Sequence, residues 1–294
     1  MKIGLIDVDS HHFPNLALMK ISAYYKRRGD FVDWWDGFTH YDAVFVSRVF
    51  DDEYSSWGEP PINADTVIFG GTGFDRKKDL PEAIENTCPD YGLYPKFPEA
   101  YGFTTRGCPR CCRFCIVSEK EGRRSRQVAD PDYFWRGQKE IKLLDPNLLA
   151  CPDHERILRK LVDSGAWVDF TQGLDIRLIT DANVWLLNRM KLKAVHFAWD
   201  NPKEDLTPFF RRYMDMAKPN RHRKPGVYVL TNFDSTHGED LYRVETLRAL
   251  GYDPYVMIYD KKRSPRETRS LQRWCNNRKL FNTIPFSEYD PRKG

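Results

Sequence analysis

Four cysteines lie within eight residues of this chain, in the run Cys108-Pro-Arg-Cys111-Cys112-Arg-Phe-Cys115. Three of them, Cys108, Cys112 and Cys115, have the spacing C-x3-C-x2-C, and an aromatic residue, Phe114, precedes the last. Three thiolates on one tight loop can bind three irons of a 4Fe-4S cube and leave the fourth iron open to an external ligand. The spacing therefore predicts an iron–sulfur cluster that acts as a reagent as well as a structural element.

Two other interpretations of these cysteines stay open. The four thiols form overlapping C-x2-C pairs that could bind zinc, or they could close a purely structural cluster. Tetrahedral zinc sites usually take their pairs from two separated segments, whereas these thiols share one loop. In the three-ligand interpretation Cys111 is not a ligand. The other cysteines are isolated and are expected to behave as small hydrophobic residues, namely Cys88, Cys151 and Cys275.

Composition favours a folded, reduced protein without a membrane span. The chain has 294 residues, 41% of them apolar and 14% aromatic, which is enough for about two domains. No apolar run approaches the roughly 18 to 20 residues that a bilayer requires. Asp7 and Asp9 interrupt the N-terminal apolar run, so no signal peptide is expected. Seven cysteines, four of them in one loop, argue against a disulfide framework. We therefore expect a cytoplasmic protein.

The N-terminal part predicts a small Rossmann-like α/β domain over residues 1–75. Short apolar runs suited to strands alternate here with one amphipathic stretch that begins at Pro14 and ends near Arg28. The expected strands are 3–8, 31–35, 43–49 and 67–69, and the expected helix is 14–28. Residues 76–100 contain Pro81, Pro89, Pro95 and Pro98 and are expected to form a connector.

From residue 101 to 294 a strand and helix pattern repeats. Counting the run before Cys108 as the first strand, we expect six β/α units, followed by a C-terminal helix and tail. Six units are too few for a closed eight-fold barrel. The predicted fold class is therefore α/β, with a Rossmann-like domain followed by a partial (β/α)6 TIM barrel. The later strands are expected at 140–144, 167–170, 194–199, 227–230 and 255–259, with helices near 152–164, 181–190, 204–217, 238–250 and 265–279.

The cysteine loop resembles that of the radical S-adenosylmethionine (SAM) superfamily, in the spacing of Cys108, Cys112 and Cys115 and in Phe114. That superfamily uses a six-unit open barrel with its cluster loop after the first strand. The resemblance implies that SAM binds the fourth iron and is split reductively, giving a 5'-deoxyadenosyl radical that modifies a substrate. It also implies an electron donor such as flavodoxin or ferredoxin as a partner. No catalytic residue beyond the cofactor site is identified.

The residues that would bind SAM are expected at the C-terminal ends of the barrel strands, where this architecture places its chemistry. Asp145 follows the second strand, and the resemblance makes it a candidate contact for the SAM amino group. Gln172, Asp175 and Arg177 follow the third strand. Arg177 could pair with the SAM carboxylate, while Gln172 or Asp175 could contact the ribose. The alternative is a capped, salt-bridged loop. Asp200 ends the fourth strand and is the remaining candidate.

The N-terminal domain also resembles the cobalamin-binding type found ahead of many radical SAM barrels, with Phe13-Pro-Asn-Leu-Ala-Leu18 and Gly70-Gly71 at matching places. The run Asp9-Ser-His11-His12-Phe-Pro14 is similar to a loop that supplies a histidine to cobalt, but it has Pro14 where that loop has glycine. Cobalamin is therefore a possible second cofactor, with ordinary polar turn residues as the alternative.

The substrate is not identified by the sequence. Basic residues cluster at 122–126, 220–224 and 261–266, and such clusters either meet phosphates or are simply solvated. Nucleic acid is therefore one possible substrate. A maturase acting on a peptide or small metabolite is the second interpretation, and a nucleic-acid-binding protein with a structural cluster is the third.

Overall fold

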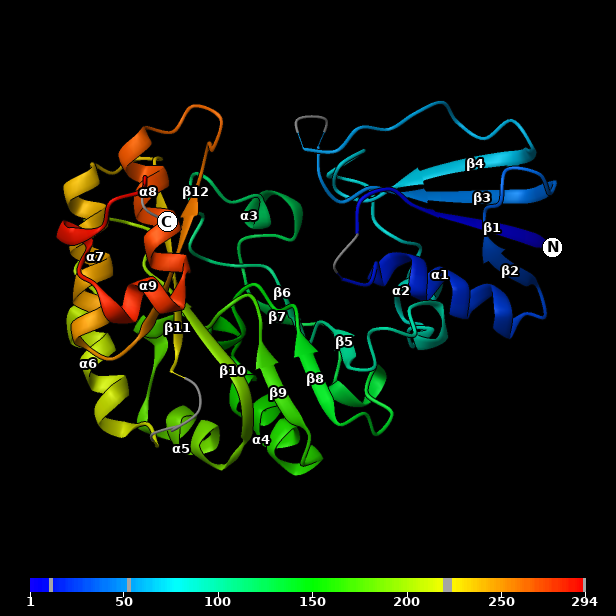
Figure 1. The fold of residues 1–294 in the computed structure, drawn as a ribbon. Helices are drawn as coiled ribbons and strands as arrows, with labels where there is room; N and C mark the ends of the chain where they lie inside the picture. The colour runs from blue at the N-terminus through cyan, green and yellow to red at the C-terminus, as the bar shows by residue number, and fades with distance from the viewer. Residues whose placement is uncertain (11–12, 52–53, 219–223, 293–294) are drawn as a thin grey trace. The chain divides into compact units, whose positions relative to one another are not determined.

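A computed structural model describes residues 1–10, 13–51, 54–218 and 224–292 (Figure 1). The chain divides into two compact units. The first contains residues 1–102 and 131–141, and the second contains residues 103–130 and 142–294. Within the described ranges, no helix has the length and apolar character needed to cross a membrane.

The first unit is built on a four-stranded sheet with the order β2-β1-β3-β4. All its neighbouring strands are parallel. Their bounds are β1 Lys2–Asp7, β2 Phe31–Trp34, β3 Tyr41–Ser47 and β4 Ala64–Gly70. Helix α1, Leu16–Arg27, buries Leu18 and Met19 in one core with Ile3 and Leu5. Asn15 caps this helix by accepting a hydrogen bond from the Leu18 amide, so the helix begins after Pro14 rather than at it.

The proline-rich segment after β4 belongs to the first unit. It contains the short helix α2, Glu82–Glu85, and the short strand β5, Ala100–Gly102. Asp90 links it to α1, because its carboxylate accepts hydrogen bonds from Ser22 and Lys26 at 2.7 Å each. Ile84 and Leu93 join the core under α1. The segment is therefore packed and hydrogen-bonded along much of its length.

The larger sheet has six strands in the order β12-β11-β10-β9-β8-β5. Strand β10 pairs in parallel with β9 and β11, and β11 pairs in parallel with β12. The strands are β8 Glu140–Leu143, β9 Trp167–Phe170, β10 Lys191–Ala198, β11 Gly226–Thr231 and β12 Asp253–Ile258. The connecting helices are α4 His154–Ser164, α5 Asp181–Arg189, α6 Thr207–Met216 and α7 His237–Ala249. These parallel sheets with intervening helices confirm the α/β class.

Two predicted helices differ from the observed ones at identifiable residues. Helix α6 begins at Thr207 and not at 204, with Pro208 in its first turn, a position that proline favours. The long helix predicted over 265–279 is divided into α8, Arg266–Asn276, and α9, Arg278–Thr283. Asn277 has extended backbone angles and accepts hydrogen bonds from the Lys279 and Leu280 amides. It therefore ends one helix and caps the next.

The strands of the larger sheet have two different faces. One face is apolar and buried, as Phe197 of β10 shows by packing its ring 4.7 Å from Tyr213 and 6.3 Å from Phe210 of α6. The opposite face carries Trp167, His196, Tyr228 and Tyr255, and we refer to it as the aromatic face. Trp167 and Tyr255 are about half exposed.

Packing on the apolar face predicts which side chains stabilise the second unit. Phe210 is fully buried, whereas its neighbour Phe209 is 38% exposed. Phe210→Ala should lower the free energy of unfolding by about 3–5 kcal/mol, because it leaves a cavity among aromatic rings. Phe209→Ala should cost about 1 kcal/mol or less. Urea unfolding measures both, and equal costs would contradict this description of the core.

Candidate functional site

The cysteine loop is closed at its base by a short antiparallel ribbon. Strand β6, Thr105–Arg106, pairs with β7, Arg126–Gln127. Gly107 continues the chain with φ of +87°, and a Cβ atom there would lie 2.2 Å from the Arg124 carbonyl oxygen. A side chain at this position is therefore excluded by both backbone angle and space. The Cys108 amide donates to the Gly122 carbonyl at 3.1 Å, which keeps the two arms of the loop together.

Glu121 anchors the far arm of the loop. Its carboxylate pairs with Arg106 at 3.0 Å and accepts a hydrogen bond from the Gly107 amide at 3.2 Å. Its carbonyl accepts a hydrogen bond from Arg126 at 2.7 Å. It follows the one-turn helix α3, Val117–Lys120. One carboxylate and one glycine outside the cysteine motif thus hold the base of the loop closed.

The three spaced cysteines differ from Cys111 in their surroundings. Cys108, Cys112 and Cys115 are partly buried, whereas Cys111 is exposed and has φ of +49°. Burial raises the pKa of Cys112 to about 11, and the nearby Cys115, Asp200 and Cys108 add to this. Burial also raises the pKa of Cys115. Metal binding at these thiols must therefore displace protons. Over the described ranges, no three His, Cys, Asp or Glu side chains are grouped around one metal-ion position.

Two contacts join this loop to residues after strands β8 and β9. The Asn147 side-chain amide lies 3.6 Å from the Cys108 sulfur and donates to Asp175 at 3.4 Å. Asp175 also forms an ion pair with Arg110 at 2.5 Å. The C-terminal ends of two strands and the thiol loop therefore meet at one place.

Aromatic packing joins the loop to the ends of β11 and β12 as well. Phe114 packs edge-on against Phe233, with ring centres 5.6 Å apart, and Phe233 packs against Tyr259 at 4.7 Å. Arg113 pairs with Asp234 at 2.7 Å. The aromatic residue of the cysteine motif thus positions the loop by packing.

Asp145 is buried, and its carboxylate bonds to other residues of the chain. Its carboxylate accepts hydrogen bonds from the amide and hydroxyl groups of both Thr104 and Thr105, at 2.5–3.0 Å. Burial raises its pKa, and these bonds oppose that effect. Its observed contacts are those of a residue that positions β6 beside β8.

Asp175 and Arg177 form a capped, ion-paired loop. Asp175 accepts a hydrogen bond from the Arg177 amide at 3.2 Å and pairs with its guanidinium at 2.7 Å. Arg177 also pairs with Glu204 at 2.7 Å, and these carboxylates raise its pKa. Hydrogen bonds and positive charge from Arg177, and then from Arg110, hold the pKa of Asp175 below its usual range. Gln172 is exposed at the end of β9.

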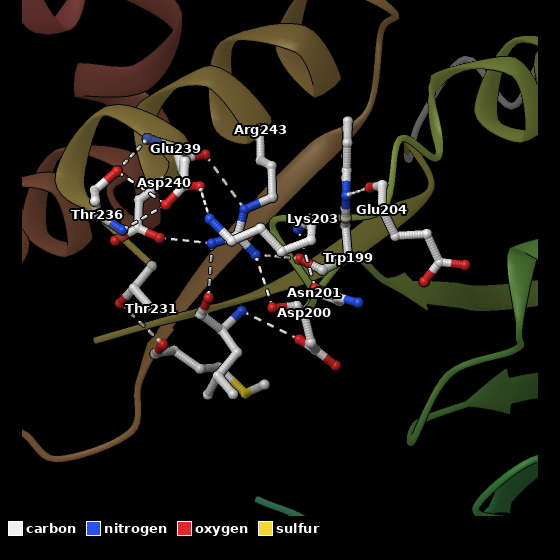
Figure 2. Close-up of polar contacts among 12 residues, drawn as sticks. Trp199, Asp200, Asn201, Lys203, Glu204, Thr231, Thr236, Glu239, Asp240 and Arg243 are labelled. Carbon is white, nitrogen blue, oxygen red and sulfur yellow. Dashed lines mark hydrogen bonds and ion pairs between the residues drawn. The ribbon is translucent and has the colours of Figure 1, made fainter. Parts of the chain in front are cut away.

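Asp200 lies beside a buried guanidinium (Figure 2). Arg243 of α7 donates to the carbonyls of Trp199 at 2.5 Å, Asp200 at 3.1 Å and Leu230 at 2.9 Å, and it pairs with Asp240 at 2.5 Å. The Asp200 carboxylate accepts a hydrogen bond from the Leu230 amide at 3.1 Å. Burial raises the pKa of Asp200 to about 6. Arg243 thereby holds the ends of β10 and β11 in one arrangement.

Two residues of this site were not singled out from the sequence. Asn147 is 4% exposed, and its side-chain oxygen is buried without a hydrogen-bond partner among the residues that the structure describes. Its place two residues after Asp145, at a predicted strand end, was the available signal. Arg243 has no such signal, because an arginine on a predicted helix is usually exposed.

The cobalamin hypothesis concerns a different part of the chain. His11 and His12 lie outside the described residues. Asp9 is buried, and its carboxylate accepts hydrogen bonds from the Val49 and Phe50 amides at 2.9 and 2.8 Å. This aspartate therefore organises the turn after β3.

No protein-family profile matches this chain, and a search of curated proteins found no significant relative.

The pKa of Asp200 gives a stability prediction for the cluster-free protein. An unfolded Asp has a pKa of 3.8, and in the folded chain it is about 6. Between these two pKa values Asp200 binds more protons in the folded state than in the unfolded state. The contribution of Asp200 to the free energy of unfolding therefore falls as pH rises through this range and is constant above it. Asp200→Asn removes this loss. Its stability relative to wild type should therefore increase by about 2–3 kcal/mol from about pH 4 to about pH 7. Urea unfolding at both pH values tests this, and a constant difference would contradict it.

Proposed function

We propose that this protein is a radical SAM enzyme, in which a Rossmann-like domain precedes a partial (β/α)6 barrel. The observation that carries the proposal is the meeting of the cysteine loop with strand ends. Asn147 contacts both the Cys108 sulfur and Asp175, and Asp200 influences the pKa of Cys112 and Cys115. Half-buried thiols beside polar strand ends suit a cofactor that is both metal-bound and hydrogen-bonded.

The donor set fits a 4Fe-4S cluster. Cys108, Cys112 and Cys115 offer three soft thiolate ligands, whereas Cys111 is exposed and is not assigned as a ligand. Ligands of a cube bind separate irons, so they need not converge on one point as ligands of a single ion do. When bound, the cluster would supply the electron that splits SAM and starts hydrogen abstraction from the substrate. A flavodoxin or ferredoxin would be the donor of that electron.

The chain's own part is to bind and orient SAM. The Asn147 side-chain oxygen is a buried acceptor beside Cys108, and it suits an ammonium donor such as the SAM amino group. Arg177 keeps further N–H donors besides those used on Asp175 and Glu204, and it suits the SAM carboxylate. Asp200 and the exposed Gln172 complete the polar rim, and Asp145 supports it through Thr104 and Thr105.

The first test is anaerobic reconstitution with iron and sulfide. The protein should take up one 4Fe-4S cluster and, after reduction with SAM, release 5'-deoxyadenosine. Ala at Cys108, Cys112 or Cys115 should abolish both the cluster absorption and the product. Cys111→Ala is the matched control and should retain both, because Cys111 is not assigned as a ligand. A cluster that forms without any SAM cleavage would favour a structural cluster, and loss of the cluster in Cys111→Ala alone would overturn the ligand assignment.

A second test concerns the SAM contacts. Asn147→Ala should weaken SAM binding by about tenfold, because it removes a buried acceptor from a charged donor. Arg177→Lys should also weaken binding, since lysine lacks the planar fork that matches a carboxylate. Isothermal titration of the cluster-loaded protein measures both effects. Asn282→Ala, on the exposed side of α9, is the control. Unchanged affinity in Asn147→Ala, with an intact cluster spectrum, would remove Asn147 from the site.

A further inference from the structure

The larger sheet has a cavity at the end opposite the thiols. It has a volume of about 380 Å³ and lies where β11 and β12 begin, at Gly226 and Asp253. Six-residue strands separate this end from the strand ends that meet the cysteine loop, which is a path of roughly 17 Å. The cavity is therefore separate from the proposed SAM site.

Aromatic rings form one wall of this cavity. Tyr255 is 50% exposed, and its ring packs edge-on against Tyr228 with centres 6.2 Å apart. The His196 ring stacks on Tyr228 at 5.1 Å, with 11° between the planes. Gly226 makes room for that ring, because a Cβ atom there would lie 2.5 Å from the imidazole. The wall is thus a fixed set of rings with Tyr255 exposed at its edge, and it suits stacking by a planar ligand.

Two cations lie at the same cavity. Lys224 is exposed and is the last residue of the basic run 220–224, whose residues 220–223 lie outside the described part of the chain. Arg278 is 67% exposed and pairs with Asp253 through Nη2 at 2.5 Å. A guanidinium has five N–H donors, so this pair leaves Arg278 able to bind an anion. Lys224 and Arg278 outnumber the carboxylate of Asp253, and the lining therefore favours a negatively charged ligand.

Most other polar groups of the lining are already used. The Tyr228 hydroxyl donates to the Thr171 carbonyl at 2.8 Å. The Asn276 amide accepts from the Val256 amide at 2.8 Å and donates to its carbonyl at 3.0 Å. The Cys275 thiol is buried against the Pro254 carbonyl. The lining thus offers few polar groups that could read a ligand's ring edge, so we expect little preference among planar rings.

From these observations we propose that the cavity binds a nucleotide, with the base stacked on Tyr255 and the phosphate held by Lys224 and Arg278. Stacking without edge reading, combined with charge, is how proteins bind single-stranded nucleic acid with little sequence preference. The ligand is a free nucleotide or one unit of a strand, and the chemistry recognised is the same. This site does not depend on the proposed radical chemistry.

The experiment is a calorimetric titration of the cluster-free 294-residue chain with uridine monophosphate. A uridine ligand is used because the proposed SAM site would itself accept an adenosine. Uridine monophosphate should bind saturably, and its affinity should fall as the salt concentration rises. Uridine alone and inorganic phosphate should each bind more weakly than uridine monophosphate does. Tyr255→Ala and Lys224→Ala should each reduce affinity about tenfold. Tyr242→Ala, an exposed tyrosine of α7, and Lys279→Ala are matched controls that should leave affinity unchanged.

A short oligouridylate distinguishes the two sources of the ligand. Binding of the oligonucleotide tighter than the mononucleotide, and sensitive to the same variants, supports a nucleic-acid strand. Binding of the mononucleotide alone supports a free nucleotide. Gly226→Ala is a further variant, which should displace His196 and reduce binding. Its urea unfolding midpoint should stay unchanged, which separates loss of the site from loss of the fold. Absence of saturable binding, or binding that none of Tyr255→Ala, Lys224→Ala and Gly226→Ala weakens, would overturn the proposal.

Discussion

The buried guanidinium of Arg243 is the interaction on which the candidate site depends. It is about 1% exposed, and it bonds carbonyls at the ends of β10 and β11 while pairing with Asp240 of its own helix. A buried charge is costly unless its donors are satisfied, so strand ends and helix must keep one mutual geometry. That geometry places Asp200 beside Leu230, where burial raises its pKa (Figure 2). One buried side chain therefore fixes the ends of β10 and β11 that form the polar edge of the sheet.

The thiol loop depends on a second constraint of a different kind. Gly107 has no space for a side chain, and Glu121 holds the adjacent amide and Arg106. These restraints keep the loop closed through contacts of the chain itself. Contacts through Asn147 and Phe114 then bring it to the strand ends. Cluster binding at raised-pKa thiols would cost proton release, but little further ordering of the loop.

The two ends of the larger sheet carry different chemistry. Thiols, carboxylates and an amide oxygen that has no partner among the described residues gather where the strands end, which suits a metal-bound cofactor with an amino acid moiety. Aromatic rings, with Tyr255 exposed among them, and cations gather where β11 and β12 begin, which suits a planar anion. Because side chains alternate along a strand, His196 and Tyr228 can face the cavity while Phe197 and Val229 fill the core between sheet and helices. One set of strands thus supports two proposed sites without sharing residues.

The sequence by itself determined the α/β class, the alternation of strands and helices, and the loop that holds three spaced cysteines. Local periodicity, capping residues and ligand spacing are properties of neighbouring residues, so they can be read without the fold. Even the break at Asn277 depends on a local cap, although the helix predicted over 265–279 runs through it. Only the tertiary structure decided that Asp145 supports β6, that Asp175 and Arg177 pair with each other, and that Arg243 and Asn147 belong to the site. These roles depend on which strand ends become neighbours and on which groups are buried there, and both follow from pairing between segments far apart in the chain.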